Sequence, residues 1–132
     1  MRLSIIALPL TFLIVCNKNS KNAVYPSELA GKWKLTEQYI STGGPGEWHS
    51  VPANNIIFLE FKSTGEFLHS SNFPHADSLF DRYNFGNNKV TATSSLNNKT
   101  AIWPVHYLDN NKLEISLLMC FEGCAYRFIS AE

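Results

Sequence analysis

The residue types that could carry catalysis lie far apart or in unsuitable arrangements. Ser, Asp and His, the three residue types of a hydrolase triad, occur together in the segment His75-Ala76-Asp77-Ser78. Four consecutive residues cannot align a nucleophile, a base and an orienting carboxylate, so this segment predicts a polar loop. No glycine-rich phosphate loop opens a helix. We therefore expect neither a catalytic site nor a cofactor.

The four histidines do not predict a metal site. His49 and His75 lie in expected loops, and His69 is expected opposite Glu60 on the outer face of a sheet. His106 is the only histidine on a strand face that could point inward. No two of them are spaced to share a metal ion, so no metal ligands are predicted.

Cys120 and Cys124 are separated by Phe121-Glu122-Gly123. In an exported chain such a pair favours a disulfide. Residues four apart on one extended strand lie about 13 Å from each other, which is too far for a disulfide. Pairing therefore requires a chain reversal between the cysteines, where Gly123 can adopt a positive φ. A shared metal ion is the alternative, and it lacks supporting ligands at suitable spacing.

The third cysteine, Cys16, ends the N-terminal segment. Arg2 is followed by an uncharged apolar run of thirteen residues, which is the layout of a secretory signal and is too short for a membrane-spanning helix. The end of this run, Leu13-Ile14-Val15-Cys16, resembles a bacterial lipoprotein signal. The resemblance implies cleavage before Cys16 and acylation of its sulfur. The alternative is cleavage elsewhere, with Cys16 removed or left as a free thiol.

Cleavage before Cys16 divides the chain into three parts. We expect a signal peptide over residues 1–15, a lipidated tether over 16–24 and one folded domain over 25–132, because 117 mature residues suffice for a single core. The mature chain has ten Lys and Arg against eleven Asp and Glu, and these charges are scattered singly. This distribution excludes the basic face that nucleic acid requires. The sixteen aromatic residues of the mature chain favour a folded β protein.

Short runs rich in Val, Ile, Thr and aromatic residues alternate with clusters of Asn, Gly and Ser, which predicts a meander of strands. The eight expected strands are Gly31–Ile40, Ile56–Lys62, Glu66–Ser71, Leu79–Phe85, Lys89–Ser94, Thr100–Leu108, Lys112–Met119 and Cys124–Ser130. Four Asn-Asn pairs lie where the chain reverses or a strand begins. Only the connection Ser41–Asn55 is long. Eight antiparallel strands in sequence order close into an all-β, up-and-down barrel, and a two-sheet sandwich is the competing architecture.

Alternation within each strand indicates which side chains face the barrel interior. Both faces of the last three strands are apolar, and we assign the more aromatic face to the interior, although a bulge would shift the register. The aromatic face carries Trp103, Val105, Ser116, Leu118, Tyr126 and Phe128, and the opposite face carries Ile102, His106, Ile115, Leu117 and Ile129. The side chains expected to line a central pocket are Leu35, Tyr39, Trp48, Leu59, Tyr83, Phe85, Trp103, Val105, Tyr126 and Phe128.

The expected strands and two further features resemble the lipocalin superfamily. Gly31-Lys32-Trp33 begins the first strand after a short helical turn, and Arg127 lies in the last strand. The resemblance implies that Trp33 plugs the closed end of the barrel and that Arg127 packs across it as a cation–π pair. It also implies that the loop Thr42–Pro52 covers the open mouth.

Two segments, Leu29-Ala30-Gly31-Lys32-Trp33-Lys34-Leu35 and Cys120-Phe121-Glu122-Gly123-Cys124, are similar to small lipocalin-like lipoproteins of bacteria related to Bacteroides. We therefore expect a monomer, lipid-anchored at Cys16 to the outer membrane of the bacterial envelope on its periplasmic or surface side. Its barrel would hold a small apolar or amphipathic ligand. The alternative is a packed barrel without a ligand, used as a structural or inhibitor module, and a hydrolase-type enzyme is a third hypothesis. An internal cavity would favour the first and a filled core the second.

Overall fold

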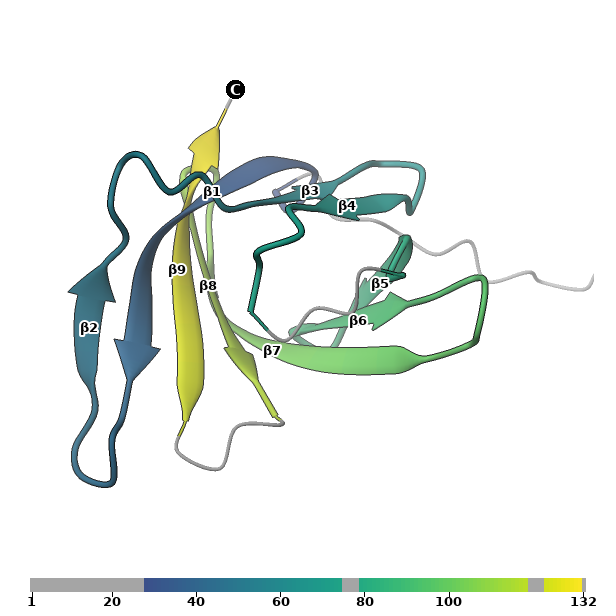
Figure 1. Cartoon of the computed structure of the whole chain (residues 1–132). Coiled ribbons are helices and arrows are strands. Elements are labelled where there is room, and N and C mark those ends of the chain that lie inside the picture. Colours follow the sequence, from purple (N-terminus) through teal and green to yellow (C-terminus); the bar gives the residue numbers. More distant parts are fainter. Residues whose placement is uncertain (1–27, 75–78, 119–122, 132) are drawn as a thin grey trace, which may run out of the picture.

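The structure is a computed structural model and describes residues 28–74, 79–118 and 123–131. These residues form nine antiparallel strands (Figure 1). The strands are β1 (Gly31–Ile40), β2 (Glu47–Ser50), β3 (Phe58–Phe61), β4 (Phe67–His69), β5 (Arg82–Gly86), β6 (Lys89–Thr93), β7 (Thr100–Leu108), β8 (Lys112–Leu117) and β9 (Cys124–Ala131). No helix within the described ranges is long and apolar enough to cross a membrane. The expected signal peptide, the tether with Cys16, the segment His75-Ala76-Asp77-Ser78 and Cys120 lie outside these ranges.

Eight of the strands follow one another around the sheet in the order β4-β3-β1-β9-β8-β7-β6-β5. The two end strands then approach each other. The amide of Phe67 donates to the carbonyl of Asp81 at 2.9 Å, and the amide of Tyr83 donates to the carbonyl of Gly65 at 3.0 Å. The sheet thus closes almost completely, and the predicted antiparallel up-and-down barrel is confirmed (Figure 1).

The tight hairpins use residues that tolerate a positive φ. Asn87 and Asn88 have φ angles of 52° and 54° and form the two-residue turn between Gly86 and Lys89. A two-residue hairpin of this type needs the left-handed conformation at both positions. Gly65, with a φ of 86°, closes the β3–β4 turn. The sequence predicted both reversals because Asn and Gly reach this region most easily.

The segment expected as one long loop contains a strand. β2 pairs with the second half of β1, and Trp48 lies opposite Tyr39. The amide of Val51 extends this ladder by donating to the carbonyl of Thr36 at 2.8 Å. The expectation that Thr42–Pro52 forms a loop over the barrel mouth is therefore corrected, because much of it forms a ribbon beside β1 (Figure 1).

A β-bulge in β1 changes which residues of that strand face inward. Leu35 pairs with Phe128, whereas Glu37 pairs with Arg127. Thr36 is therefore one extra residue in β1, and the alternation of faces restarts after it. Its hydroxyl donates to the carbonyl of Arg127 at 3.1 Å. The second half of β1 consequently presents its odd-numbered side chains to the outside.

A second bulge lies in β7. Val105 pairs with Ile115, whereas Tyr107 pairs with Glu114, so His106 is the extra residue. His106 is exposed and does not point inward. The bulge displaces β8 by one residue relative to the expected register, and this displacement brings the Ile115 side of β8 to the interior.

The predicted interior face was therefore correct for β7 and β9 and wrong for β8. Ile115 and Leu117 are buried, whereas Leu118 is 63% exposed. Leu117 lies opposite Cys124, and the predicted turn at Phe121-Glu122-Gly123 lies mostly outside the described residues. Because Cys120 lies outside the described residues, its pairing with Cys124 stays a prediction.

Candidate functional site

The barrel interior contains most of the expected pocket residues. Leu35, Leu59, Tyr83, Trp103, Tyr126 and Phe128 are buried, and Phe85 and Val105 are half-buried against the same core. Trp33 is also buried, and its indole N–H donates to the carbonyl of Leu29 at 2.8 Å. Alternation thus identified inward-facing side chains of β3, β5 and the first half of β1, and the choice of the more aromatic face identified those of β7 and β9.

The ring of Phe73 lies among these interior side chains. Its centroid is 5.9 Å from that of Trp103, 5.5 Å from that of Tyr126 and 6.0 Å from that of Phe128, and only 3% of the residue is exposed. Phe73 belongs to the connection after β4, where its amide donates to the carbonyl of Ser70 at 3.1 Å. Its ring therefore fills part of the space in which the sequence predicted a ligand.

Other aromatic residues extend this cluster toward the seam between β4 and β5. The Phe61 ring lies 5.2 Å from Phe67 and 5.0 Å from Tyr83, and Phe67 lies 5.6 Å from Trp103. The Tyr83 hydroxyl donates to the carbonyl of Lys62 at 2.8 Å. Within the described residues, no buried polar side-chain atom lacks a hydrogen-bond partner. The interior is thus an aromatic core with its polar atoms satisfied.

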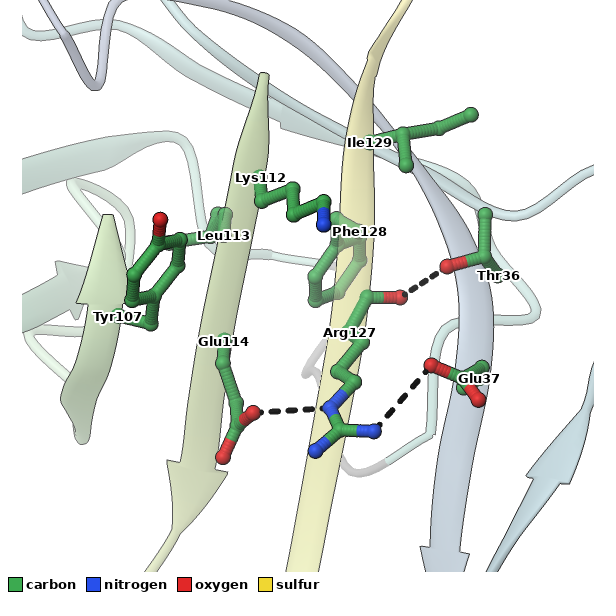
Figure 2. Close-up of a pocket in the computed structure, with 9 residues that line it drawn as sticks. All are labelled: Thr36, Glu37, Tyr107, Lys112, Leu113, Glu114, Arg127, Phe128 and Ile129. Carbon is green, nitrogen blue, oxygen red and sulfur yellow. Dashed lines mark hydrogen bonds and ion pairs between the residues drawn. The ribbon is translucent and has the colours of Figure 1, made fainter. Parts of the chain in front are cut away.

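Arg127 lies on the outer face, where it joins three strands. Its Nε donates to Glu114 on β8 at 2.9 Å, and its Nη1 donates to Glu37 on β1 at 3.4 Å (Figure 2). The hydrogen bond to Glu114 contributes most to raising the pKa of Arg127, and Glu37 adds to it. The Arg127 side chain is 40% exposed, so solvent weakens these ion pairs.

The guanidinium of Arg127 also stacks on Trp48, and its central carbon lies 3.7 Å from the ring centroid. Trp48 in turn contacts Tyr39 edge to face, with the ring centroids 5.5 Å apart. A Cβ at Gly46 would overlap the Tyr39 ring, so a larger residue there would have to displace that ring. Two expectations are therefore corrected: Tyr39 and Trp48 lie outside the barrel, and Arg127 packs on Trp48 rather than on Trp33.

A groove of about 300 Å³ lies beside this network on the outer face (Figure 2). It is lined by Thr36, Glu37, Tyr107, Lys112, Leu113, Glu114, Arg127, Phe128 and Ile129. Tyr107 and Ile129 are 51% and 44% exposed. The Tyr107 hydroxyl donates to Asp109 at 2.6 Å, and this bond raises the pKa of Tyr107 and lowers that of Asp109. The sequence missed this groove because it depends on both bulges.

A second pocket, of about 330 Å³, lies next to the β7 bulge and includes His106. The Nε2 of His106 is 2.8 Å from the hydroxyl oxygen of Ser116, which is the nucleophile–base contact of a hydrolase. No carboxylate in the described part of the chain orients the other ring nitrogen. This pair therefore supplies one contact of a triad and lacks the orienting group.

Of the other histidines, His69 packs against a neighbouring ring, and His75 lies outside the described residues. His69 lies opposite Leu59, not opposite Glu60 as expected. Its ring stacks on that of Phe67, with the ring centroids 5.3 Å apart. His49 is exposed on β2. Across residues 28–74, 79–118 and 123–131, no group of three or more His, Cys, Asp or Glu side chains is placed to hold a metal ion.

Comparisons with known proteins add nothing to this geometry. No protein-family model matches the sequence, and no curated protein matches it. The likeness of Gly31-Lys32-Trp33 to lipocalins therefore stays a resemblance.

Proposed function

We propose that this chain is a lipid-anchored, non-enzymatic module of the bacterial envelope with a packed barrel interior, which acts through its outer face. Among the hypotheses from the sequence, this corresponds to the packed barrel without a ligand, used as a structural or inhibitor module. The observation that carries it is the position of Phe73, whose ring contacts Trp103, Tyr126 and Phe128 inside the barrel. A side chain of the protein occupies the place of the expected ligand.

An apolar ligand in this place would have to displace the Phe73 ring. Burial of a phenylalanine side chain stabilises a protein by about 1.5–3 kcal/mol, and each aromatic pair adds about 0.5–1.5 kcal/mol. Three such pairs surround Phe73. Each 1.4 kcal/mol is a tenfold change in an equilibrium constant. Displacement of the Phe73 ring would therefore lower the affinity for an interior ligand by several orders of magnitude.

The envelope location rests on the sequence. The apolar run that ends at Cys16 supports export and acylation, and the polar residues 17–24 suit a tether between the anchor and the barrel. A domain presented in this way needs a rigid scaffold. The packed interior supports that role.

One observation favours a second candidate, the barrel that binds a small apolar ligand inside. Phe73 is contributed by a connection and not by a strand. Its ring can therefore leave the interior without breaking the β-ladder. In this second candidate Phe73 would exchange with the ligand.

Native mass spectrometry of the lipidated protein, purified from its own host, distinguishes the two candidates. We expect the mass of the acylated chain without a bound apolar molecule. The Phe73→Ala protein should acquire an apolar molecule of about ring size, because a dry apolar cavity binds such molecules. Phe58→Ala is the matched control, since Phe58 is half-buried on the outer face beneath Lys32. A stoichiometric apolar molecule bound to the unmodified protein would overturn the proposal.

A further inference from the structure

On the outer face of the sheet, polar and charged side chains form a row across four neighbouring strands, β7, β8, β9 and β1. Tyr107 pairs with Glu114, Glu114 pairs with Arg127, and Arg127 pairs with Glu37. Side chains opposite each other on one face of a sheet have Cβ atoms about 4.5–5.5 Å apart. The four residues therefore form a continuous strip at one side of the outer groove (Figure 2).

This strip keeps hydrogen-bonding capacity after its internal bonds are made. Arg127 uses Nε and Nη1, and Glu114 and Glu37 each use only the Oε2 oxygen. The second oxygen of each carboxylate and the Nη2 of Arg127 have no partner in the described residues. The ammonium of Lys112, which also lines the groove, likewise makes no ion pair with them. The groove thus offers two free acceptors beside two free donors.

The charges and the walls of the groove limit the chemistry of its ligand. Two carboxylates, Glu37 and Glu114, balance two cations, Lys112 and Arg127, so neither an anion nor a cation is favoured. The exposed Tyr107 ring and the Ile129 side chain add apolar surface. A volume of about 300 Å³ is at the lower end for small-molecule sites. The ligand should therefore be small, neutral, rich in hydroxyls and apolar on its faces.

We infer that the outer groove binds one or two units of a neutral saccharide. Sugar hydroxyls donate to the free carboxylate oxygens of Glu37 and Glu114, which lie on opposite sides of Arg127 (Figure 2). Arg127 and Lys112 donate to sugar oxygens, and the Tyr107 ring packs against a C–H face of the sugar. This inference rests on the proposed function, in which the outer face is the working surface.

The network around Arg127 prepares the groove for binding. Stacking on Trp48 and two ion pairs fix the guanidinium, and the lining side chains of β1, β8 and β9 are on paired strands. Because these side chains are already held in place, binding of the ligand costs less conformational entropy. Strands also hold binding groups more rigidly than loops do.

Saturation-transfer difference NMR tests this inference on the lipidated full chain in nanodiscs. The probes are glucose, galactose, mannose, N-acetylglucosamine and their β-linked disaccharides. We expect at least one probe to receive saturation. We expect Tyr107→Ala and Ile129→Ala to weaken its binding by about tenfold, which corresponds to about 1.4 kcal/mol.

Ile102→Ala is the matched control, because Ile102 is 43% exposed against 44% for Ile129 and does not line the groove. It should leave sugar binding unchanged, and equal circular dichroism melting curves would show that the variants are folded. The inference is overturned if no probe binds, or if Tyr107→Ala and Ile102→Ala have the same effect. Absence of sugar binding, with no apolar molecule in the native mass spectrum, would refute only the saccharide site and leave the proposed function standing.

Discussion

The contact between Arg127 and Trp48 gives the sharpest test of the outer-face assignment. Cation–π pairs contribute about 0.5–1 kcal/mol at exposed sites and about 2 kcal/mol when desolvated. Arg127 is 40% exposed and lies 3.7 Å from the Trp48 ring centroid, so we expect a coupling free energy of about 1 kcal/mol. Trp33 lies inside the barrel and has no such contact, so its coupling with Arg127 should stay below about 0.5 kcal/mol.

Two double-mutant cycles measure these couplings. The variants are Arg127→Ala, Trp48→Ala and Trp33→Ala, with the two pairwise combinations, all in a Cys16→Ser background that removes the acylation site. Urea unfolding followed by far-ultraviolet circular dichroism gives the free energy of unfolding of each protein. Trp33→Ala alone should cost about 3–5 kcal/mol, because Trp33 is buried. Coupling of Arg127 to Trp33 rather than to Trp48 would refute the outer-face assignment and restore the lipocalin-type closure.

Three further changes test the core, the cysteines and the anchor. Phe73→Ala should lower the free energy of unfolding by about 3–5 kcal/mol, and a loss below about 1 kcal/mol in urea unfolding would show that its ring is not packed in the core. Cys120 and Cys124 should resist alkylation before reduction in intact-mass measurements, and two alkylated thiols would contradict the disulfide, which in so short a loop should contribute at most about 2–3 kcal/mol. Cys16→Ser should move the protein from the membrane fraction to the soluble fraction, and an uncleaved, membrane-bound product would refute the lipoprotein signal.

The barrel was predictable because its signals are local. β3, β5 and the first half of β1 have a period-two pattern, and Asn87, Asn88 and Gly65 mark the reversals by their tolerance of positive φ. β2 was missed because Gly and Pro before it indicate a loop, whereas pairing with β1 overrides that local preference.

The assignment of faces failed where the register depends on more than one strand. Thr36 and His106 are single extra residues in otherwise regular runs, and nothing in their side chains marks a bulge. Phe73 was missed for a different reason, since it lies beside the polar residues His75 and Asp77. An aromatic residue followed by proline inside a polar connection is the one signal that could have indicated a side chain directed into the core.

The bulge at Thr36 divides β1 between the two surfaces of the sheet. Before it, Leu35 belongs to the core, and after it, Glu37 and Tyr39 belong to the outer face. Substitutions in the two halves can therefore accumulate independently during evolution. Deletion of Thr36 would leave Leu35 opposite Phe128 and Glu37 opposite Arg127, so it would remove the bulge without moving a later side chain of β1 to the other face. In any relatives of this protein, a β1 that is one residue shorter at this position should consequently keep the same side chains in the core and on the outer face.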